Sequence, residues 1–398
     1  MKRTLIAITV AAGMVLGVGY GRAAGQAKEA PAANKAIGAD ALAKAQADLK
    51  KGMDYLVAQR NPDGGWGFAP GKSHAALTAM VVKALVQHPD YGSGSDLVKK
   101  GVEVVMKYRQ KDGGFYDPAE GNQNYVTSVV VMALAAVGDP AHKDALADAV
   151  KFLRGQQIAP DSTTPSGEKI DGKHPYVGGV SYGEHGRPDM SNLGFWVQAM
   201  HEAGVKGDDP AMQRALGFVT RMQNRAEGKE GETFTFKGPG DGGWIYAVTR
   251  KGNEFIGQSG AGSGPDGLRS YGSMTYTGFM SMLYANVDRN DPRIKAAYDW
   301  IRKYWRLDSN PNMPDAQSHE GLFYYYHAFA KALRAWGQDV ITDAADVKHN
   351  WREELIGALH GRQKADGSWT NEKAERWEEG NPVLATTYCV LALEEAMK

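Results

Sequence analysis

Residues 55–66 read Tyr-Leu-Val-Ala-Gln-Arg-Asn-Pro-Asp-Gly-Gly-Trp, a helical segment that ends in glutamine and runs into a glycine–aromatic turn. The pattern returns three times, with turns Asp112-Gly113-Gly114-Phe115, Asp241-Gly242-Gly243-Trp244 and Asp366-Gly367-Ser368-Trp369. Two degraded copies have Val177-Gly178-Gly179 and Glu320-Gly321-Leu322-Phe323 at the turn. Because glycine reaches backbone angles closed to other residues and the aromatic ring covers the helix ends, we interpret these turns as structural staples of a six-copy repeat.

Each turn is followed by a second helical segment that is apolar or small around most of its circumference. These segments span residues 75–86, 125–137, 191–203, 273–286, 322–336 and 384–397. Such helices must be buried on most sides, whereas the segments before the glutamine carry charges among their apolar positions. The pattern predicts an all-α fold, an α/α toroid of about six helical hairpins in two concentric layers. We expect one domain over residues 41–398 with long loops at 158–188 and 225–271, and no alternating run indicates a sheet.

The composition excludes several classes of protein. Of 398 residues, 42% are hydrophobic and 23% are charged, which is typical of a packed globular chain. Lys plus Arg and Asp plus Glu both number 46, so the chain has no basic excess and we expect no nucleic-acid partner. The single cysteine, Cys389, lies in an apolar run and is predicted to be buried and inert.

The N-terminus resembles a secretory signal. Met1-Lys2-Arg3 is basic, residues 5–19 are apolar, and Ala23-Ala24-Gly25 supplies small residues for cleavage. We therefore predict a signal peptide at 1–27, a flexible leader at 28–40 and export to the periplasm or the extracellular space, with an uncleaved anchor as the alternative. No second stretch is long enough to cross a bilayer, so no transmembrane domain is expected after cleavage.

The glutamine-to-Gly-x-Trp repeat resembles that of the squalene–hopene cyclases and the protein prenyltransferase β subunits, across the whole mature chain. The resemblance implies a central cavity that opens where the inner helices begin. It also implies isoprenoid substrates, handled by acid-initiated cyclisation or by zinc-dependent prenyl transfer.

The residues for both chemistries are replaced. Cyclases of this type need an Asp-x-Asp-Asp motif at the start of an inner helix, whose middle Asp protonates an alkene. The matching segment here is 189–194, in which Asp189 remains and Ser191 stands at the position of the proton donor. The positions that would hold prenyltransferase zinc are Tyr324, Tyr326 and Ala385. We accordingly predict no metal site and no cofactor.

Residues that start the inner helices converge on the predicted cavity mouth, where a concave pocket with polar groups is the expected binding site. The predicted ligand-binding residues are His74, Tyr125, Asn192, Tyr276 and Tyr325. The run 324–326 covers three faces of a helix, so at most two of its tyrosines can face the cavity and the rest pack in the core.

Asp189 and His327 are the candidates for a catalytic role, each with a structural alternative. Asp189 neighbours Glu184 and His185 and could do acid–base work with them, or it could cap the helix that starts near Ser191. His327 replaces a residue that is small in the other copies, so it either fills a packing gap or faces a ligand.

Three functions remain open. The first is an extracytoplasmic relative without standard cyclase or prenyltransferase chemistry, which binds a hydrophobic or isoprenoid molecule at the toroid mouth, or a protein partner through the long loops. The second is a divergent terpene cyclase with a relocated proton donor. The third is an enzyme for another substrate, such as a polysaccharide, whose sugar rings suit aromatic walls.

Overall fold

The computed structural model describes residues 36–227 and 234–398, and these ranges form twelve α-helices. The odd-numbered helices are α1 (Ala39–Ala58), α3 (Asp96–Met106), α5 (Lys143–Gln156), α7 (Pro210–Met222), α9 (Pro292–Lys303) and α11 (Trp351–His360). The even-numbered helices are α2 (Ala75–Gln87), α4 (Gln123–Val137), α6 (Met190–Glu202), α8 (Gly272–Tyr284), α10 (Leu322–Trp336) and α12 (Pro382–Met397). The even-numbered helices match the six predicted apolar segments to within two residues at each end.

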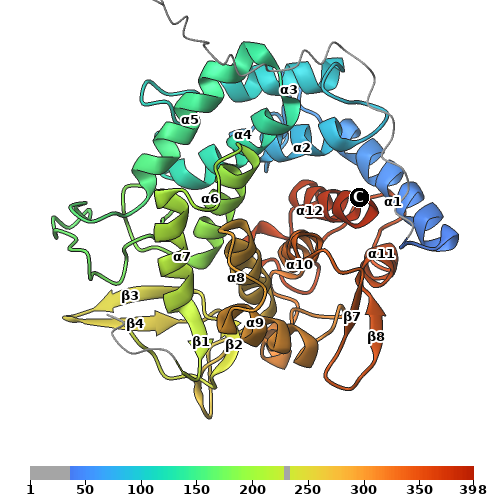
Figure 1. Cartoon of the computed structure of the whole chain (residues 1–398). Helices are drawn as coiled ribbons and strands as arrows, with labels where there is room; N and C mark the ends of the chain where they lie inside the picture. The colour runs from blue at the N-terminus through green and yellow to red at the C-terminus, as the bar shows by residue number, and fades with distance from the viewer. Residues whose placement is uncertain (1–35, 228–233) are drawn as a thin grey trace, which may run out of the picture. The chain divides into compact units, whose positions relative to one another are not determined.

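The even-numbered helices form a closed inner ring. Each contacts the next, from α2 through α4, α6, α8 and α10 to α12, and α12 contacts α2 again. Figure 1 shows the odd-numbered helices outside this ring. Nearly every residue of α12 is buried, whereas α3 buries only its Val98, Gly101, Val102, Val104 and Val105 face. The predicted all-α toroid with two layers of helices is therefore confirmed.

The aromatic residue of each repeat turn joins its own two helices. The backbone N–H of Trp66 donates to Thr78 Oγ1 on α2 at 2.9 Å, and its indole N–H donates to Leu56 O at the end of α1 at 2.6 Å. The backbone bond recurs in the other well-preserved copies, from Phe115 to Thr127, Trp244 to Thr275 and Trp369 to Thr386. Each bond satisfies a donor that burial would otherwise leave without a partner, which accounts for the repetition of the motif.

In two of the well-preserved copies the glutamine joins neighbouring repeats, whereas Gln110 bonds within its own repeat, to Tyr108 O and Tyr116 O. Gln223 Nε2 donates to Gly242 O in its own turn and to Arg293 O at the start of α9, at 2.8 and 2.9 Å. Gln363 Nε2 makes the same pair of bonds to Gly367 O and to Asp48 O on α1. Because Gln363 follows the last outer helix and Asp48 lies on the first, this side chain ties the two ends of the repeat array together.

The first glycine of each turn lies against the next outer helix. Gly242 has φ +88°, and a Cβ there would lie 2.3 Å from Ala296 O on α9. Gly367 has φ +88°, and its Cβ would lie 2.4 Å from Lys51 O on α1. Glycine is thus required both by the backbone angle and by the close approach of two backbones.

Short β-hairpins occupy the loops, which the sequence did not predict. They pair β1 (Gln223–Arg225) with β2 (Asp241–Trp244), β3 (Ala247–Lys251) with β4 (Glu254–Gln258), β5 (Ser263–Gly264) with β6 (Gly267–Leu268), and β7 (Val340–Thr342) with β8 (Lys348–Asn350). The longest has strands of five residues joined by Gly252-Asn253, a two-residue turn that favours tight hairpins. Strands this short give too few alternations to stand out in a sequence.

The loop at 158–188 has no helix or named strand. The loop at 225–271 contains the β3–β4 and β5–β6 hairpins and strand β2, which pairs with β1 at the start of the loop. The predicted signal peptide at 1–27, and the leader at 28–40 as far as residue 35, lie outside the described residues. Among the helices that the structure describes, none is both long enough and apolar enough to cross a membrane.

Candidate functional site

A cavity of about 500 Å³ opens where the inner helices begin. All six inner helices contribute to its wall, either from their first two turns or from the residue that caps them. The helical and capping residues are His74, Asn122, Tyr125, Ser191, Asn192, Phe195, Tyr271, Ser273, Met274, Tyr324, Leu384 and Tyr388. The loops add Phe68, Glu120, Tyr182, Tyr246, Trp377, Glu378 and Glu379. This volume and a largely apolar wall are typical of small-molecule sites.

Four aromatic residues from the inner helices α4, α6, α10 and α12 form a connected cluster in this wall. The Tyr125 and Phe195 rings meet edge to face at 5.0 Å, Phe195 and Tyr324 are 5.8 Å apart, and Tyr324 and Tyr388 are 6.0 Å apart. Burial raises the pKa of Tyr125 to about 12, so its hydroxyl stays neutral. The cluster presents ring faces and neutral hydroxyl groups to the cavity.

Three partly exposed aromatic residues stand in the loop part of the wall. Phe68, Tyr182 and Trp377 expose 39%, 45% and 44% of their surface, which is unusual for large apolar side chains. Trp377 and Glu378 follow each other with φ +59° and +62°. Consecutive left-handed residues other than glycine are costly, and such backbone concentrates at functional sites.

The charged side chains of the cavity wall are acidic, with one histidine. His74 Nε2 lies 3.0 Å from Glu120 Oε2, and burial lowers the pKa of His74. Glu378 and Glu379 come from the loop before α12. A carboxylate beside an imidazole, and a second carboxyl group, can take up and release protons.

Glu379 is the most deeply buried acid of this wall, with 1% of its surface exposed. Its Oε1 accepts from the backbone N–H of Tyr324, in the first turn of α10, and its Oε2 accepts from Asn371 Nδ2, both at 2.7 Å. Burial raises the pKa of Glu379 to about 7 although these hydrogen bonds favour its ionised form, and no cation is among its main influences. The carboxyl group therefore titrates near neutral pH in an aromatic wall.

Residues 69–246 match the model of the squalene–hopene cyclase C-terminal domain. A drimenyl diphosphate synthase from Streptomyces showdoensis is 25% identical over 197 residues, covering 49% of this chain and 31% of that protein. The squalene–hopene cyclase of Alicyclobacillus acidocaldarius is 26% identical over 180 residues, covering 44% and 27%. The alignment thus spans about a third of the length of the curated relatives.

Solved structures share the fold over nearly the whole chain. A variant of the type II terpene cyclase MstE from Scytonema, in complex with geranylgeranyl dihydroxybenzoate, superposes with a TM-score of 0.54 at 13% identity, covering 91% of this chain and 99% of that one. The chain therefore has the α/α toroid fold of the terpenoid cyclases, and its residues 69–246 resemble the squalene–hopene cyclase C-terminal domain. An α-1,6-mannanase from Salegentibacter gives a TM-score of 0.56 at 8% identity, covering 89% and 98%, which shows that a hydrolase of sugars shares the fold.

In this terpenoid cyclase-like chain, three of the five predicted ligand-binding residues line the cavity. They are His74, Tyr125 and Asn192. The other two, Tyr276 and Tyr325, are fully buried against each other at 5.5 Å outside the cavity wall. The Tyr325 hydroxyl donates to Arg306 O in the loop after α9. Because a helix turns about 100° per residue, Tyr324 faces the cavity and Tyr325 points away from it.

Asp189 caps α6. Its Oδ1 accepts from the backbone N–H of Asn192 at 2.9 Å and from Ser191 Oγ at 2.7 Å, and its Oδ2 accepts from Asn192 Nδ2 at 2.9 Å. The residue is fully buried and is not part of the cavity wall. These contacts are those of a helix N-cap, which is the structural alternative that the sequence offers for Asp189.

His327 lies one turn beyond Tyr324 on α10, behind the cavity wall. Its ring is 5.7 Å from that of Tyr388, and its Nδ1 has no hydrogen-bond partner among the described residues. Burial, and then the charges of Lys331 and Lys83, lower the pKa of His327 to about 3. The imidazole is therefore neutral at ordinary pH, and it packs between the cavity and a cluster of ion pairs.

The acidic and aromatic loop residues of the cavity were not predicted. Glu379, Glu378 and Trp377 belong to the segment between the last turn and α12, which has no counterpart motif in the other repeats. The one feature of the sequence that could have pointed to them is their position, a few residues before the start of an inner helix. Within residues 36–227 and 234–398, no group of three or more His, Cys, Asp or Glu side chains could hold a metal ion.

Proposed function

We propose that this chain is an exported, terpenoid cyclase-like protein that binds a hydrophobic molecule of the isoprenoid class in its cavity. The observation that carries the proposal is the aromatic wall, in which Tyr125, Phe195, Tyr324 and Tyr388 from four inner helices surround a space of about 500 Å³. Burial of apolar area against such rings contributes about 25 cal/mol per Å². The substrates of the superfamily relatives support the isoprenoid class.

The two chemistries of the relatives are not part of this proposal. Ser191 stands at the position of the cyclase proton donor, and its hydroxyl donates to Asp189. A neutral hydroxyl is far too weak an acid to protonate an alkene at useful rates. Tyr324 and Tyr326 stand where zinc ligands would be, and tyrosine phenols with raised pKa values are poor substitutes for a thiolate.

Export rests on the sequence of the first 27 residues. A basic start, an apolar run at 5–19 and small residues at 23–25 support removal of a signal peptide. Fractionation of cells that express the full chain should recover it outside the cytoplasm, and deletion of residues 2–25 should return it to the cytoplasm. Equal cytoplasmic recovery of both forms would reject export.

The binding proposal is tested by native mass spectrometry and lipid extraction of the protein purified from its own compartment. We expect a bound polyprenoid-type molecule in the parent chain and its loss in Ser191→Trp, which places an indole in the cavity wall. Ser191→Ala removes the hydrogen bonds to Asp189 and Tyr246 but adds no bulk, and it should retain the ligand. Val347→Trp, at an exposed site outside the wall, controls for added bulk. Retention of the ligand in Ser191→Trp would contradict the proposal.

A second candidate is acid-initiated chemistry on the same ligand, and one observation favours it. Glu379 is a cavity carboxyl group whose pKa is raised to about 7 by burial, so a protonated donor is available near neutral pH. Incubation with squalene-type polyenes should then give products that Glu379→Gln abolishes. Asp189→Asn separates this candidate from a donor at the α6 cap, because Asp189 does not line the cavity. Absence of turnover by the parent chain would remove the candidate.

The polysaccharide alternative is supported by the mannanase fold and by the exposed Trp377, Tyr182 and Phe68 rings, which suit the faces of sugars. Release of reducing ends from α-1,6-mannan, with loss in Glu379→Gln, would favour it over isoprenoid binding. A protein partner on the loops 158–188 and 225–271 is tested by deleting β3–β4 and comparing the proteins that cross-link to the chain.

A further inference from the structure

The charges of the cavity wall have one sign. Glu120, Glu378 and Glu379 line it, and none of its described lining residues is Lys or Arg. His74 is the remaining titratable base. Burial lowers its pKa below the ordinary value of 6.5, so its imidazole is mostly neutral above that pH. A ligand with a phosphate or carboxylate head group would meet like charge here.

Three basic side chains that contact residues of the wall already have partners. Arg376 pairs with Glu320 at 2.7 Å and lies over the Trp377 ring at 4.5 Å. Arg187 bonds to Gln258 and lies over the Tyr246 ring at 5.3 Å. Lys72 is 3.9 Å from Glu120 and largely exposed. Each already has an acceptor or a ring face, so none is a free anion receptor in the wall.

One acceptor of the wall lacks a matching donor. Asn192 is 99% buried, and its Oδ1 has no hydrogen-bond partner among the described residues, while its Nδ2 is held by Asp189. Glu379 accepts from Asn371 and from backbone N–H groups at the start of α10, but no Lys or Arg in the described ranges forms an ion pair with it. The Asn192 oxygen therefore calls for a donor from the ligand, and the Glu379 carboxyl group is without a counter-cation.

We infer that the ligand is an amine-bearing isoprenoid amphiphile, whose apolar body packs on the aromatic cluster and whose ammonium head group binds between the acidic side chains and the loop aromatics. The inference rests on the proposed function and specifies its ligand class. Aromatic faces attract cations, and ammonium groups are bound in aromatic cages in this way. Trp377 and Tyr182 supply such faces beside Glu378 and Glu379.

The strained loop supports a fixed position for this head group. Trp377 and Glu378 are kept in their left-handed conformation by neighbours on both sides: Asn381 N–H donates to Glu378 O at 2.9 Å, and Asn371 N–H donates to Glu379 O at 3.0 Å. The Trp377 ring lies on Gly321 at the start of α10, where a Cβ would come within 3.1 Å of it. The loop therefore holds the Trp377 ring and the Glu379 carboxyl group before a ligand arrives, which lowers the entropy cost of binding.

The test uses isothermal titration calorimetry at pH 8 with three probes that share one hydrocarbon chain: geranylgeranylamine, geranylgeraniol and geranylgeranyl diphosphate. We expect the amine to bind at least about tenfold more tightly than the alcohol, and the diphosphate most weakly. Equal or tighter binding of the alcohol or the diphosphate would overturn the inference and leave the proposed function in place. Failure of all three to bind would remove the proposed function and the inference together.

Variants locate the head group. Glu379→Gln should weaken the amine about tenfold and change the alcohol less than about twofold. Glu379 also accepts a hydrogen bond from the start of α10, so its loss could disturb the fold. Glu378→Gln and Trp377→Leu test the same head-group site without removing that hydrogen bond. Glu375→Gln, an exposed acid in the same loop outside the wall, is the matched control and should change neither ligand. An equal loss of both ligands in all three wall variants would overturn the inference.

Discussion

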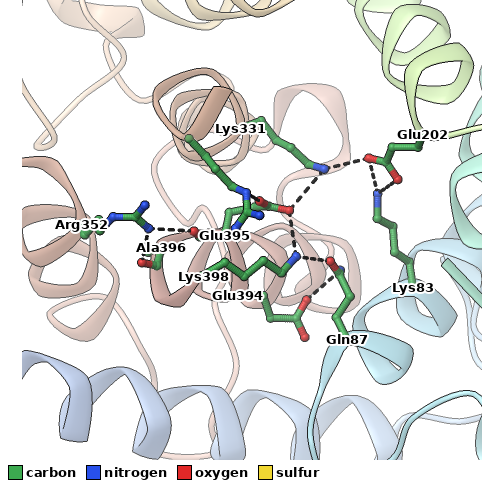
Figure 2. A network of polar contacts seen from close by, with 10 residues as sticks. Lys83, Gln87, Glu202, Lys331, Arg352, Glu394, Glu395, Ala396 and Lys398 are labelled. Carbon is green, nitrogen blue, oxygen red and sulfur yellow. Dashed lines mark hydrogen bonds and ion pairs between the residues drawn. The ribbon is translucent and has the colours of Figure 1, made fainter. Parts of the chain in front are cut away.

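Lys331 on α10 donates a hydrogen bond to Glu202 on α6 at 2.8 Å, across two inner helices that are not neighbours in the ring. Glu202 also binds Lys83 on α2, and Lys331 lies 3.3 Å from Glu395 on α12. Figure 2 shows these side chains meeting between the helices. Four of the six inner helices therefore share one network of ion pairs near their C-terminal ends, the end opposite the cavity.

The network is buried and coupled. Side-chain exposure is 7% for both Lys83 and Lys331 and 20% for Glu202. Burial opposes the ionisation of Glu202, but Lys331 and Lys83 overcome it and lower its pKa to about 2. Burial also lowers the pKa of Lys83, to about 8, although Glu202 opposes this shift. Glu202 is thus the acid on which the charge of Lys83 depends.

Glu202→Gln is expected to destabilise the protein by about 3–5 kcal/mol at pH 7, because it leaves Lys83 buried without its acid partner. Urea unfolding measures the free energy. Lys83→Met with Glu202→Gln should recover part of the loss, since the uncompensated charge is gone. Asp54→Asn removes an exposed pair with Lys50, 2.7 Å apart, and should cost less than about 1 kcal/mol. Additive losses in the double variant would contradict coupling.

His327 should make the protein acid-sensitive. Its folded-state pKa is about 3, lowered first by burial and then by Lys331 and Lys83, against an ordinary value of 6.5. Between pH 3 and pH 6.5 the His327 side chain is therefore protonated in the unfolded chain but neutral in the folded chain, so the folded state loses stability as pH falls from about 6.5. The slope approaches about 1.4 kcal/mol per pH unit.

His327→Leu should flatten this part of the stability–pH curve between pH 4 and pH 6, measured by urea unfolding at each pH. His142→Leu is the comparison: His142 is only half-buried, in the short turn before α5, and its loss should change the slope less than the loss of His327. An unchanged slope in His327→Leu would show that the imidazole is protonated in the folded protein.

The glycine of the repeat turn is expected to be irreplaceable. Gly242→Ala would require a left-handed φ of +88° and would bring the new Cβ within 2.3 Å of Ala296 O, so we expect a loss of at least about 2 kcal/mol in thermal or urea unfolding. Gly155→Ala is the matched control: Gly155 lies in α5 with open space around it, and alanine there should add about 0.5–1 kcal/mol. Similar effects of both changes would contradict the staple interpretation.

The features of this fold that the sequence predicts are those that recur in every repeat. The aromatic residue and the residue before it each make the same bond in every well-preserved copy, as Trp66 does with Thr78 and Gly65 with Asp63, and the repeated turn predicts the ring. The cavity residues that lie at the starts of the repeated inner helices, such as His74 and Asn192, could be predicted for the same reason.

The rest of the site depends on features that occur once. Glu379 gains its position from a single loop with two left-handed residues, and its pKa from burial that no local pattern encodes. Tyr324 and Tyr325 are adjacent and chemically identical, so only the rotation of α10 in the ring decides which one faces the cavity. The network of Glu202, Lys83 and Lys331 joins residues more than 100 positions apart, which a single sequence does not pair.

The affinity for an amine should rise with pH through the titration of Glu379. Its folded-state pKa is raised to about 7 by burial, so the carboxyl group is mostly neutral at pH 6 and mostly ionised at pH 8, while an alkylammonium group stays charged. His74, whose pKa is lowered, is already neutral above pH 6.5, and the tyrosines of the wall have raised pKa values. The change between pH 6.5 and 8 therefore belongs to Glu379.

Calorimetry with geranylgeranylamine at pH 6.5, 7 and 8 should show a several-fold gain in affinity. In buffers of different ionisation enthalpy it should also show proton release at pH 6.5–7, because a bound cation lowers the pKa of Glu379. Glu379→Gln should remove both effects, whereas Glu375→Gln should keep them. Geranylgeraniol provides the ligand control, since a neutral head group gains nothing from an ionised carboxylate. Proton uptake on amine binding would contradict the assignment of the head group to Glu379.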